Sequence, residues 1–309
     1  MVAFWYALRM TDEPLILAVD GGATKTRAVL STTTGAALGE AVGGPCNLFQ
    51  DPDAGLAEIK ALWRQLATTA GLDPDVAAAR TTLSAGLAGA NAAGSKSRLD
   101  AAFPTFAERH LSTDGYTSLL GATAGRPGAL LAIGTGVVGY RLLASGELLK
   151  LSGWGFPVGD RGGGAWLGLT AVGDWLEARD RYPDAPDSTL WPRLRNLLGD
   201  STADILGWLK AARPAEFASL APVVIDAAAA GDIKARTLLD AAAGHHVRLA
   251  SALTPSPAEP LVLGGGLAGV FRSAIETALG PALADAGHTA SPLDGARLIA
   301  LGQNPAEFT

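Results

Sequence analysis

Short apolar runs that end in clusters of glycine recur along the chain. Residues 15–19 are five consecutive apolar residues, and the segment 20–23 that follows contains two glycines. Residues 26–30 resume with β-branched and apolar side chains, and a further candidate strand spans 37–42. Because such runs between turn residues are typical of strands, the pattern predicts three strands, of which the first two form a hairpin with a glycine tip.

A helix is predicted after the third strand. Asp51 and Pro52 favour a helix start, since Asp caps the first turn and Pro fits its first position, and Gly71 marks the expected end. Apolar residues at helical spacing predict its buried face, namely Leu56, Ile59, Leu62, Trp63 and Leu66. A buried strand at 81–85 is predicted next.

The strand pattern restarts near the middle of the chain. Strands are predicted at 129–133, 137–143 and 148–151, with a glycine turn at 134–136. The helices predicted after them span 164–178, 190–198, 201–212, 217–230 and, with Asp232 as its cap, the segment ending near residue 253. A last strand, 261–263, enters three glycines and another helix. The repetition indicates a duplicated α/β unit with a boundary near 125–128.

Composition limits the class of protein. The 309 residues are enough for two domains, and 48% apolar against 17% charged residues exclude a mostly disordered chain. The net charge of −6 argues against a broad grip on a nucleic-acid backbone, and no apolar run reaches the roughly 18 residues of a membrane span. Cys46 is the one cysteine, which allows no internal disulfide or cysteine metal cage and fits a cytoplasmic protein. We interpret residues 1–14 as an N-terminal extension.

The first glycine turn has the composition of a phosphate-binding loop. It ends in Lys-Thr, yet Val19 and Thr24 stand where a P-loop requires glycine. In a tight glycine turn, backbone N–H groups can approach phosphate, with Thr24 and Lys25 as side-chain donors, and Asp20 could hold Mg²⁺ through water. An ordinary hairpin turn explains the same residues equally well.

Two more glycine turns could contact a nucleotide. The turn 134–136 lies between two predicted strands, so a duplicated fold would place two facing hairpins around one polyphosphate. The turn 264–266 lies between a strand and a helix, which suits contact with a base and ribose, while a close strand–helix connection is the plain alternative. A Rossmann site is disfavoured because the segment lacks a clean Gly-x-Gly-x-x-Gly near the start of a fold unit.

A candidate catalytic carboxylate lies in the first half. A short strand around 110–112 delivers Asp114 to the start of a helix near Tyr116. A carboxylate there could take the proton of a substrate hydroxyl. Asp is also a preferred helix cap, and the pattern alone favours that capping role.

The densest glycine region, 152–166, interleaves its glycines with Trp154, Asp160 and Arg161. Such a loop suits a polyhydroxyl ligand, because a carboxylate accepts hydroxyl protons and Trp covers an apolar ring face. A glycine-rich linker or a core Trp is the alternative. Asn47 is a loop amide that also fits a plain turn.

The four histidines do not form a recognisable catalytic or metal-binding set. His245 and His246 lie within one long predicted helix, point in different directions and have no carboxylate or cysteine at metal-ligand spacing. We interpret both as structural.

Taken in order, these motifs resemble those of a known group. The motifs are 20–26, 113–114, 133–136, 153–155 with 159–162, and 263–266. The chain is similar, from about residue 15 to 301, to the N-acetylglucosamine kinase group, which the activator ATPases of benzoyl-CoA reductases share, within the superfamily of sugar kinases, heat-shock chaperones and actin. The resemblance implies an α/β fold of two ribonuclease-H-like lobes, the actin-like ATPase fold, with a nucleotide cleft between them. The first lobe would span 15–125, the second 126–292, and a last helix near 293–305 would return to the first.

The resemblance also implies residue roles. Asp20 would face Mg²⁺ and Asp114 would be the catalytic base. The groups implied to bind ATP are Asp20, Gly21, Gly22, Thr24, Lys25, Thr26, Gly134, Thr135, Gly136, Gly264, Gly265 and Gly266. The sugar contacts implied are Asn47, Asp114, Trp154, Gly155 and Asp160. Three positions depart from the usual pattern of the group: Ala23, Val137 and Gly163.

The activity implied is Mg²⁺-ATP-dependent phosphorylation of an amino sugar at its 6-hydroxyl. N-acetylglucosamine is the first candidate, and glucosamine or another amino sugar is a close alternative. An activator-type ATPase is disfavoured because Cys46 alone provides no bridging cluster, and an actin-like switch would have no evident use for the loop around Trp154. The partners implied are a sugar and ATP, with no nucleic acid and no membrane, in a cytoplasmic homodimer.

Overall fold

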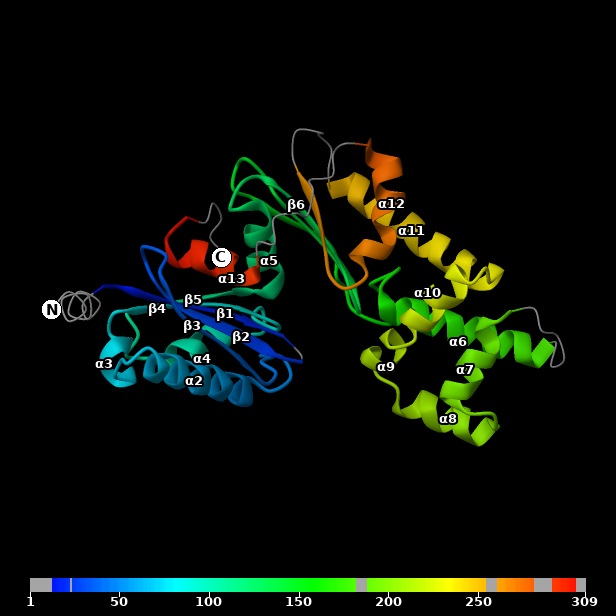
Figure 1. Cartoon of the computed structure of the whole chain (residues 1–309), viewed down its shortest axis with the longest axis horizontal. Coiled ribbons are helices and arrows are strands. Elements are labelled where there is room, and N and C mark those ends of the chain that lie inside the picture. The colour runs from blue at the N-terminus through cyan, green and yellow to red at the C-terminus, as the bar shows by residue number, and fades with distance from the viewer. Residues whose placement is uncertain (1–12, 23, 182–187, 254–259, 281–290, 304–309) are drawn as a thin grey trace. The chain divides into compact units, whose positions relative to one another are not determined.

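The computed structural model describes residues 13–22, 24–181, 188–253, 260–280 and 291–303. The chain divides into two compact units (Figure 1). The first contains the described residues of Met1–Pro127 and Gly287–Thr309 together with Leu142–Leu148. The second contains Gly128–Arg141 and the described residues of Leu149–Ala286.

The first unit is built on a five-stranded sheet with the order β3-β2-β1-β4-β5. Its strands are β1 (Leu15–Gly21), β2 (Thr26–Thr32), β3 (Ala37–Gly43), β4 (Thr81–Leu87) and β5 (Glu108–Thr113). Its helices are α2 (Pro52–Thr69), α3 (Pro74–Ala78), α4 (Ser95–Ala102), α5 (Asp114–Thr123) and α13 (Pro292–Ala300). The pairs β1–β2 and β2–β3 are antiparallel, whereas β1, β4 and β5 run parallel. The predicted glycine-tipped hairpin is therefore confirmed.

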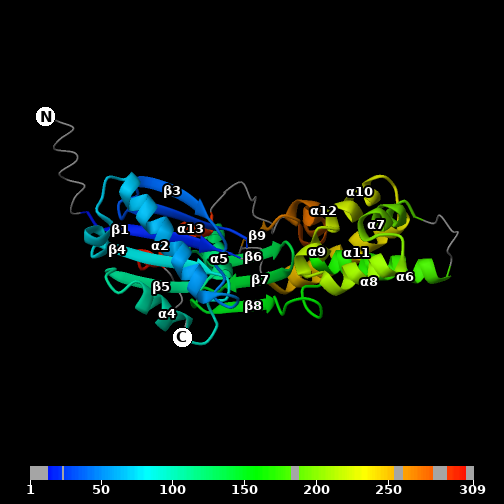
Figure 2. The same cartoon turned by 90° about the horizontal axis from the view of Figure 1, so that it is seen from below.

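Helices cover both faces of this sheet. Leu17 and Val19 of β1 belong to the core cluster that also contains the buried face of α2, whereas Ile16 and Ala18 pack with Leu293 of α13. Figures 1 and 2 show α2 and α13 on opposite sides of the strands. The uninterrupted apolar run in β1 follows from this arrangement, because a strand buried on both faces has no polar side to present.

The second unit repeats the opening of the first with a four-stranded sheet of order β8-β7-β6-β9. The strands are β6 (Gly128–Ile133), β7 (Val137–Leu142), β8 (Leu148–Ser152) and β9 (Leu261–Gly264), with β9 parallel to β6. The helices are α6 (Gly164–Arg181), α7 (Leu190–Leu198), α8 (Thr202–Ala211), α9 (Pro214–Ala218), α10 (Ala221–Ala229), α11 (Ile233–Leu253) and α12 (Ala268–Leu279). The apolar faces of these helices, apart from α9, form one core with β6 and β9.

Most predicted elements occur within a few residues of their expected limits. The start of α2 is as expected, since the carboxylate of Asp51 accepts the N–H of Ala54 at 3.0 Å. The single helix predicted at 217–230 is wrong, because the chain forms α9 and α10 there instead. Pro222 explains the break: it has no N–H to donate, and its ring would clash with the carbonyl of Ala218 in a continuous helix. The short helices α3 and α4 were not predicted.

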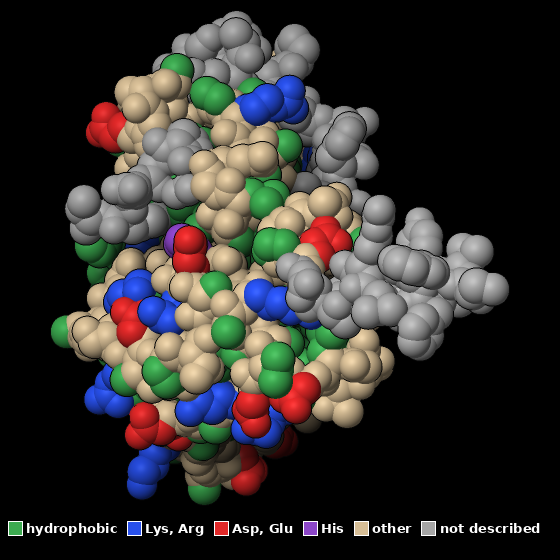
Figure 3. Space-filling view, turned by 90° about the vertical axis from the view of Figure 1, so that its left-hand side faces the viewer, with side chains coloured by type: hydrophobic (Ala, Val, Ile, Leu, Met, Phe, Trp, Pro, Cys, Tyr) green, Lys and Arg blue, Asp and Glu red, His purple; other side chains and the backbone are tan. Residues whose placement is uncertain are grey.

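The surface bears on the predicted partners. Within the described part of the chain, no helix combines the length and apolar character that a membrane span requires. Figure 3 shows one face of the molecule, on which basic and acidic side chains are interspersed. The homodimer, the cytoplasmic location and the absence of nucleic-acid binding stay predictions.

Candidate functional site

The carboxyl ends of three parallel strands meet at one edge of the first sheet. Gly21 at the end of β1 pairs with Leu87 at the end of β4, and Leu87 pairs with Thr113 at the end of β5. Asp20 precedes Gly21 and Asp114 follows Thr113, so the strand register brings both carboxylates to the same edge. Such edges are where α/β proteins commonly bind ligands.

The two carboxylates interact electrostatically. Asp20 is half-buried, and its pKa is raised first by burial and then by the negative charge of Asp114. Arg27 and Lys25 oppose this shift with their positive charges. Repulsion between two carboxylates would be relieved by a cation beside them.

The carboxylates at this edge suit a bound Mg²⁺ ion. Among the described residues, no three His, Cys, Asp or Glu side chains form a metal-binding cluster. Mg²⁺ in phosphoryl-transfer sites is held by one or two carboxylates, by substrate phosphates and by water. Asp20 is therefore a suitable ligand, directly or through water, only when a phosphate-bearing ligand supplies further oxygens.

Asp114 is not the helix cap that the residue pattern favoured. The hydroxyl of Thr113 accepts the N–H of Tyr116 at 3.2 Å and so caps α5, while Asp114 is the first residue within the helix. The Asp114 side chain is exposed, and its Oδ1 accepts the N–H of Gly115 at 2.8 Å. The capping role that competed with a chemical role for Asp114 therefore belongs to Thr113.

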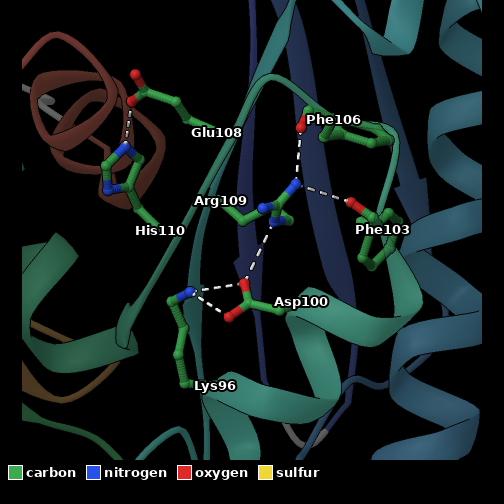
Figure 4. A network of polar contacts seen from close by, with 7 residues as sticks. All are labelled: Lys96, Asp100, Phe103, Phe106, Glu108, Arg109 and His110. Atoms are coloured by element: carbon green, nitrogen blue, oxygen red, sulfur yellow. Dashed lines mark hydrogen bonds and ion pairs between the residues drawn. The ribbon is translucent and has the colours of Figure 1, made fainter.

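A network of polar contacts holds β5, the edge strand that leads to Asp114, in place (Figure 4). Arg109 of β5 donates to the carbonyl of Phe106 at 2.7 Å and to that of Phe103 at 3.3 Å, and its Nε donates to Asp100 at 3.3 Å. Lys96 pairs with the same Asp100 carboxylate at 2.6 Å. Strand β5 is therefore held by the end of α4 on one side and by β4 on the other.

The first glycine turn is ordered by backbone contacts. The N–H of Gly22 donates to the carbonyl of Lys25 at 3.0 Å, and the side chains of Thr24 and Lys25 are exposed. Thr26 is buried, and its hydroxyl donates to the carbonyl of Gly44 at 2.7 Å, which fixes the turn to the chain after β3. Ala23 lies outside the described residues. Thr24 and Lys25 therefore remain the side-chain donors that face solvent in this turn, while the Thr26 hydroxyl is engaged.

Asn47 lies at the same edge of the sheet. It forms an isolated parallel bridge with Ala88, the residue after β4. Its Oδ1 accepts the N–H of Phe49 at 2.9 Å and that of Gln50 at 3.3 Å, so the side-chain oxygen shapes the turn before α2. The turn-forming interpretation accounts for this oxygen, and the side-chain amide N–H groups are the part of Asn47 that would donate to a ligand.

The second glycine turn is tied to the start of α6. The carbonyls of Gly134 and Thr135 accept the N–H groups of Gly164 and Ala165 at 2.8 and 2.9 Å. A Cβ at Gly163 would lie 2.8 Å from the Thr135 carbonyl oxygen. This close approach explains the glycine at position 163, one of the three departures from the pattern of the similar group.

The third glycine turn, 264–266, lies against the end of β6, the strand that leads into the second glycine turn. Gly265 has a φ of +87°, and a Cβ there would lie 2.4 Å from the carbonyl oxygen of Ile133, which accepts the N–H of Leu267 at 2.9 Å. A cavity of about 350 Å³ lies here within the second unit. Its lining includes Gly134, Gly136, Asp160 and Gly265, so the structure brings these four predicted residues together.

The loop predicted to contact a sugar is exposed and close to the second turn. Trp154 is 88% exposed, so the alternative of a core tryptophan is wrong. Gly155 donates its N–H to Asp160 Oδ1 at 3.4 Å, and a Cβ at Gly136 would lie 2.3 Å from Asp160 Oδ2. The Asp160 carboxylate therefore rests against the second glycine turn.

The sequence interpretation missed two cations near these groups. Lys150 of β8 lines the cavity and donates to the carbonyl of Gly153 at 3.2 Å. Arg27 lies opposite Asp20 in the β1–β2 register and forms an ion pair with Glu40 at 2.9 Å. The hairpin register could have identified Arg27, because directly opposed residues share one face. No pattern in the sequence placed Lys150 near the second glycine turn.

Comparison with known proteins gives matches along most of the chain. Residues 17–296 match the BadF/BadG/BcrA/BcrD ATPase family. Glucosamine kinase GspK of Vibrio cholerae is 32% identical over 253 residues, which cover 81% of this chain and 84% of that protein. An N-acetylmuramic acid/N-acetylglucosamine kinase of Clostridium acetobutylicum is 25% identical over 235 residues, which cover 74% and 75%.

A solved structure is also similar. A proposed N-acetylglucosamine kinase of Chromobacterium violaceum shares 32% sequence identity and a TM-score of 0.83, with 93% of this chain and 99% of that chain covered. Both units of the fold therefore have counterparts in one solved protein.

Proposed function

Because the chain belongs to the BadF/BadG/BcrA/BcrD ATPase family, we propose that it is an ATP-dependent kinase that phosphorylates an amino sugar at its 6-hydroxyl. The similarity to the solved structure confirms the predicted actin-like α/β fold. The single observation that carries the reaction is the pair of carboxylates, Asp20 and Asp114, at the carboxyl edge of β1, β4 and β5. A phosphoryl transfer needs a proton acceptor and an anionic ligand for a metal, and this edge offers both.

Asp114 is the proposed base. Its exposed carboxylate takes the proton of the sugar hydroxyl while the hydroxyl oxygen forms a bond to the γ-phosphorus of ATP and the bond to ADP breaks. Asp20 is the proposed ligand of Mg²⁺. When bound, Mg²⁺ neutralises charge on the phosphates, as in other phosphoryl-transfer enzymes.

The glycine turns are proposed to bind the nucleotide. Small residues allow backbone N–H groups to approach phosphate oxygens, and the exposed Lys25 adds a positive charge beside the first turn. In the second unit, the turns 134–136 and 264–266 line or adjoin one cavity, which supports a role for both in binding the same ligand. Trp154, Gly155 and Asp160 are the proposed sugar contacts of that unit, and Asn47 that of the first.

Two acceptors are candidates. The proposed N-acetylglucosamine kinase of similar structure favours N-acetylglucosamine, and the 32% identical glucosamine kinase favours glucosamine. The two sugars differ in charge and size at the 2-position, since the free amine is cationic at neutral pH and the acetamide is neutral. An acidic pocket around the 2-position would favour glucosamine, and an apolar one would favour the acetylated sugar.

The test is ADP release with Mg²⁺-ATP and, in separate reactions, N-acetylglucosamine, glucosamine, N-acetylmuramic acid, glucose or no sugar. We expect one amino sugar to stimulate release strongly and Asp114→Asn to abolish the stimulation. Glu108→Gln, at the start of the strand that leads to Asp114 and among the residues of Figure 4, is the matched control and should remain active. ATP hydrolysis that ignores every sugar would contradict the proposal and favour an activator-type ATPase.

A further inference from the structure

One side chain of helix α11 supports the loop that carries Asp160. His246 is fully buried, and its Nε2 lies 3.2 Å from the carbonyl oxygen of Gly162, 84 residues away in sequence. Gly162 has a φ of +88°, and a Cβ there would lie 2.7 Å from His246 Cε1. The imidazole ring therefore lies directly against the loop backbone.

The hydrogen bond defines the state of the ring. A carbonyl oxygen only accepts, so His246 Nε2 carries the proton and donates. Its Nδ1 is buried with no hydrogen-bond partner among the described residues, which fits an unprotonated nitrogen. Burial lowers the pKa of His246 to about 4, so the ring is neutral at physiological pH. Phe271 packs edge-on against the ring at a centroid distance of 4.5 Å.

The supported loop has an unfavourable backbone conformation. Asp160 has a φ of +56°, in the left-handed region that is uncommon for residues with a Cβ, although Asp enters it more readily than most. The N–H of Gly163 donates to the Asp160 carbonyl at 3.0 Å, and the N–H of Gly159 donates to Gly155 at 2.7 Å. Strained backbone of this kind persists only where its surroundings hold it in place. The two backbone hydrogen bonds are local, whereas the hydrogen bond from His246 reaches this loop from a distant part of the sequence.

We propose that His246 is a positioning residue for sugar binding. Its hydrogen bond to Gly162 holds the 159–163 segment so that the Asp160 carboxylate stays beside Gly136 and ready to accept sugar hydroxyls. The inference rests on the proposed function, because Asp160 is a sugar contact only if the protein is a sugar kinase. It assigns a role in substrate binding to a buried histidine that the sequence interpretation left as structural.

The test compares three variants of the full chain. His246→Leu keeps an apolar side chain and removes the donor, His246→Gln can still donate to Gly162, and Phe271→Leu disturbs the same core while leaving the hydrogen bond intact. We expect His246→Leu to raise the KM for the sugar about tenfold, the effect of one lost hydrogen bond, with kcat changed about twofold or less. His246→Gln should recover most of the loss, and Phe271→Leu should lower Tm without changing this KM.

Amide hydrogen exchange provides a readout that does not depend on turnover. Residues 153–163 should exchange faster in His246→Leu than in wild type or Phe271→Leu. An unchanged sugar KM in His246→Leu, or an equal rise in Phe271→Leu, overturns the positioning role alone. Wild-type protein that responds to no sugar overturns the proposed function and the role in sugar binding together. Should His246→Leu fail to fold, His246→Asn takes its place under the same criteria, because its shorter amide cannot reach Gly162, and His246→Gln remains the variant expected to keep a KM near that of wild type.

Discussion

The two units hold their candidate groups in different ways. In the first unit, the candidate chemistry belongs to charged side chains, Asp20 and Asp114, whose positions follow from the register of three parallel strands. In the second unit, part of it belongs to glycine backbone, and at two of these glycines a single Cβ would collide with a neighbouring residue. A Cβ would lie 2.3 Å from Asp160 at Gly136 and 2.4 Å from Ile133 at Gly265.

This contrast predicts that substitutions in the two units affect the protein in different ways. A change in the first unit can remove a charge while the strands keep their register, so it should affect the rate of the reaction more than the fold. A side chain added at Gly136 or Gly265 would enter space that other atoms already occupy, so it should displace the loop that is proposed to bind the ligand. The variants below test this division, from the largest expected effect to the smallest.

Removing the proposed base should produce the largest effect. Asp114→Asn keeps the size of the side chain, and Thr113 still caps α5, so the fold should persist. We expect kcat to fall by about 10²–10⁴-fold, as for the loss of a general base, with sugar binding nearly unchanged. Steady-state ADP release and calorimetric sugar titration measure the two effects. Near-normal turnover in Asp114→Asn, with Glu108→Gln equally active, would remove Asp114 from the chemistry.

Removing a carboxylate of the second unit, Asp232, should instead affect stability and not the chemistry. Asp232 is buried and has no proposed chemical role, and it stabilises the starts of both α7 and α11. Its carboxylate accepts hydrogen bonds from Ser188 at 2.7 Å, Thr189 at 3.1 Å, Leu190 at 3.1 Å and Ala235 at 2.9 Å. Asp232→Ala should lower the free energy of unfolding by about 3 kcal/mol, since it removes a cap and leaves buried donors unpaired. Urea denaturation at pH 7, with the exposed Asp240→Ala as control, measures the loss.

The pH dependence of Asp232 has a definite sign. Burial alone would raise its pKa, but the hydrogen bonds from Ala235, Ser188, Leu190 and Thr189 together lower it. A carboxyl whose pKa is lower in the folded state stabilises the protein above its unfolded pKa of about 3.9, and this contribution is lost as the pH falls through the folded pKa. The difference between wild type and Asp232→Ala should therefore narrow below about pH 4. A constant difference down to pH 3 would mean that packing, and not the charge, carries the effect.

Features encoded by neighbouring residues were predictable from the sequence. Asp51 at the start of α2 and Asp232 at the start of α11 cap their helices as expected, because a cap depends on residues two to four positions away. The glycine-tipped hairpin is equally local. The roles of the candidate site residues, by contrast, stay predictions, although Gly134, Gly136, Asp160 and Gly265 do line one cavity.

Features that depend on distant contacts were not predictable. The competition between Thr113 and Asp114 for the cap of α5 was decided by side-chain geometry, since both residue types cap helices well. Lys150 lines the cavity because β8 lies beside β7, and His246 meets Gly162 because α11 packs under a loop 84 residues away. A single sequence gives no measure of such separations.

A methyl group added at Gly136 should test how strongly the second unit depends on close packing around this glycine. Gly136→Ala would direct its Cβ into the Asp160 carboxylate, so we expect the KM for the sugar to rise by about tenfold or more, given the cost of overpacking. Gly173→Ala in α6 is the matched control, because a Cβ there meets nothing within 4 Å. Its activity should be unchanged. If both variants bind sugar like wild type, Asp160 does not depend on the shape of the second turn.

The smallest effect should be a gain in stability in the first unit. Burial and the charge of Asp114 raise the pKa of Asp20, so the ionised carboxylate destabilises the folded state at neutral pH. This penalty is absent at pH 3 and develops as the pH rises through the unfolded pKa of about 3.9. Asp20→Asn should therefore raise the free energy of unfolding at pH 7 by about 1 kcal/mol, a gain typical of relief at a functional site, while activity is lost.

The pairing of Asp20 with Asp114 can be tested in a double-mutant cycle. If repulsion between the two carboxylates contributes to the penalty, Asp20→Asn should stabilise the Asp114→Asn protein less than it stabilises wild type. Thermal unfolding of the four proteins at pH 7 and pH 3 measures this coupling, with Asp240→Asn as an exposed control. Equal gains in both backgrounds would show that burial alone raises the pKa of Asp20, and the first unit would then hold two independent carboxylates. A smaller gain in the Asp114→Asn background would mean that the strand register of the first unit brings the proposed base and the proposed metal ligand close enough for their charges to interact.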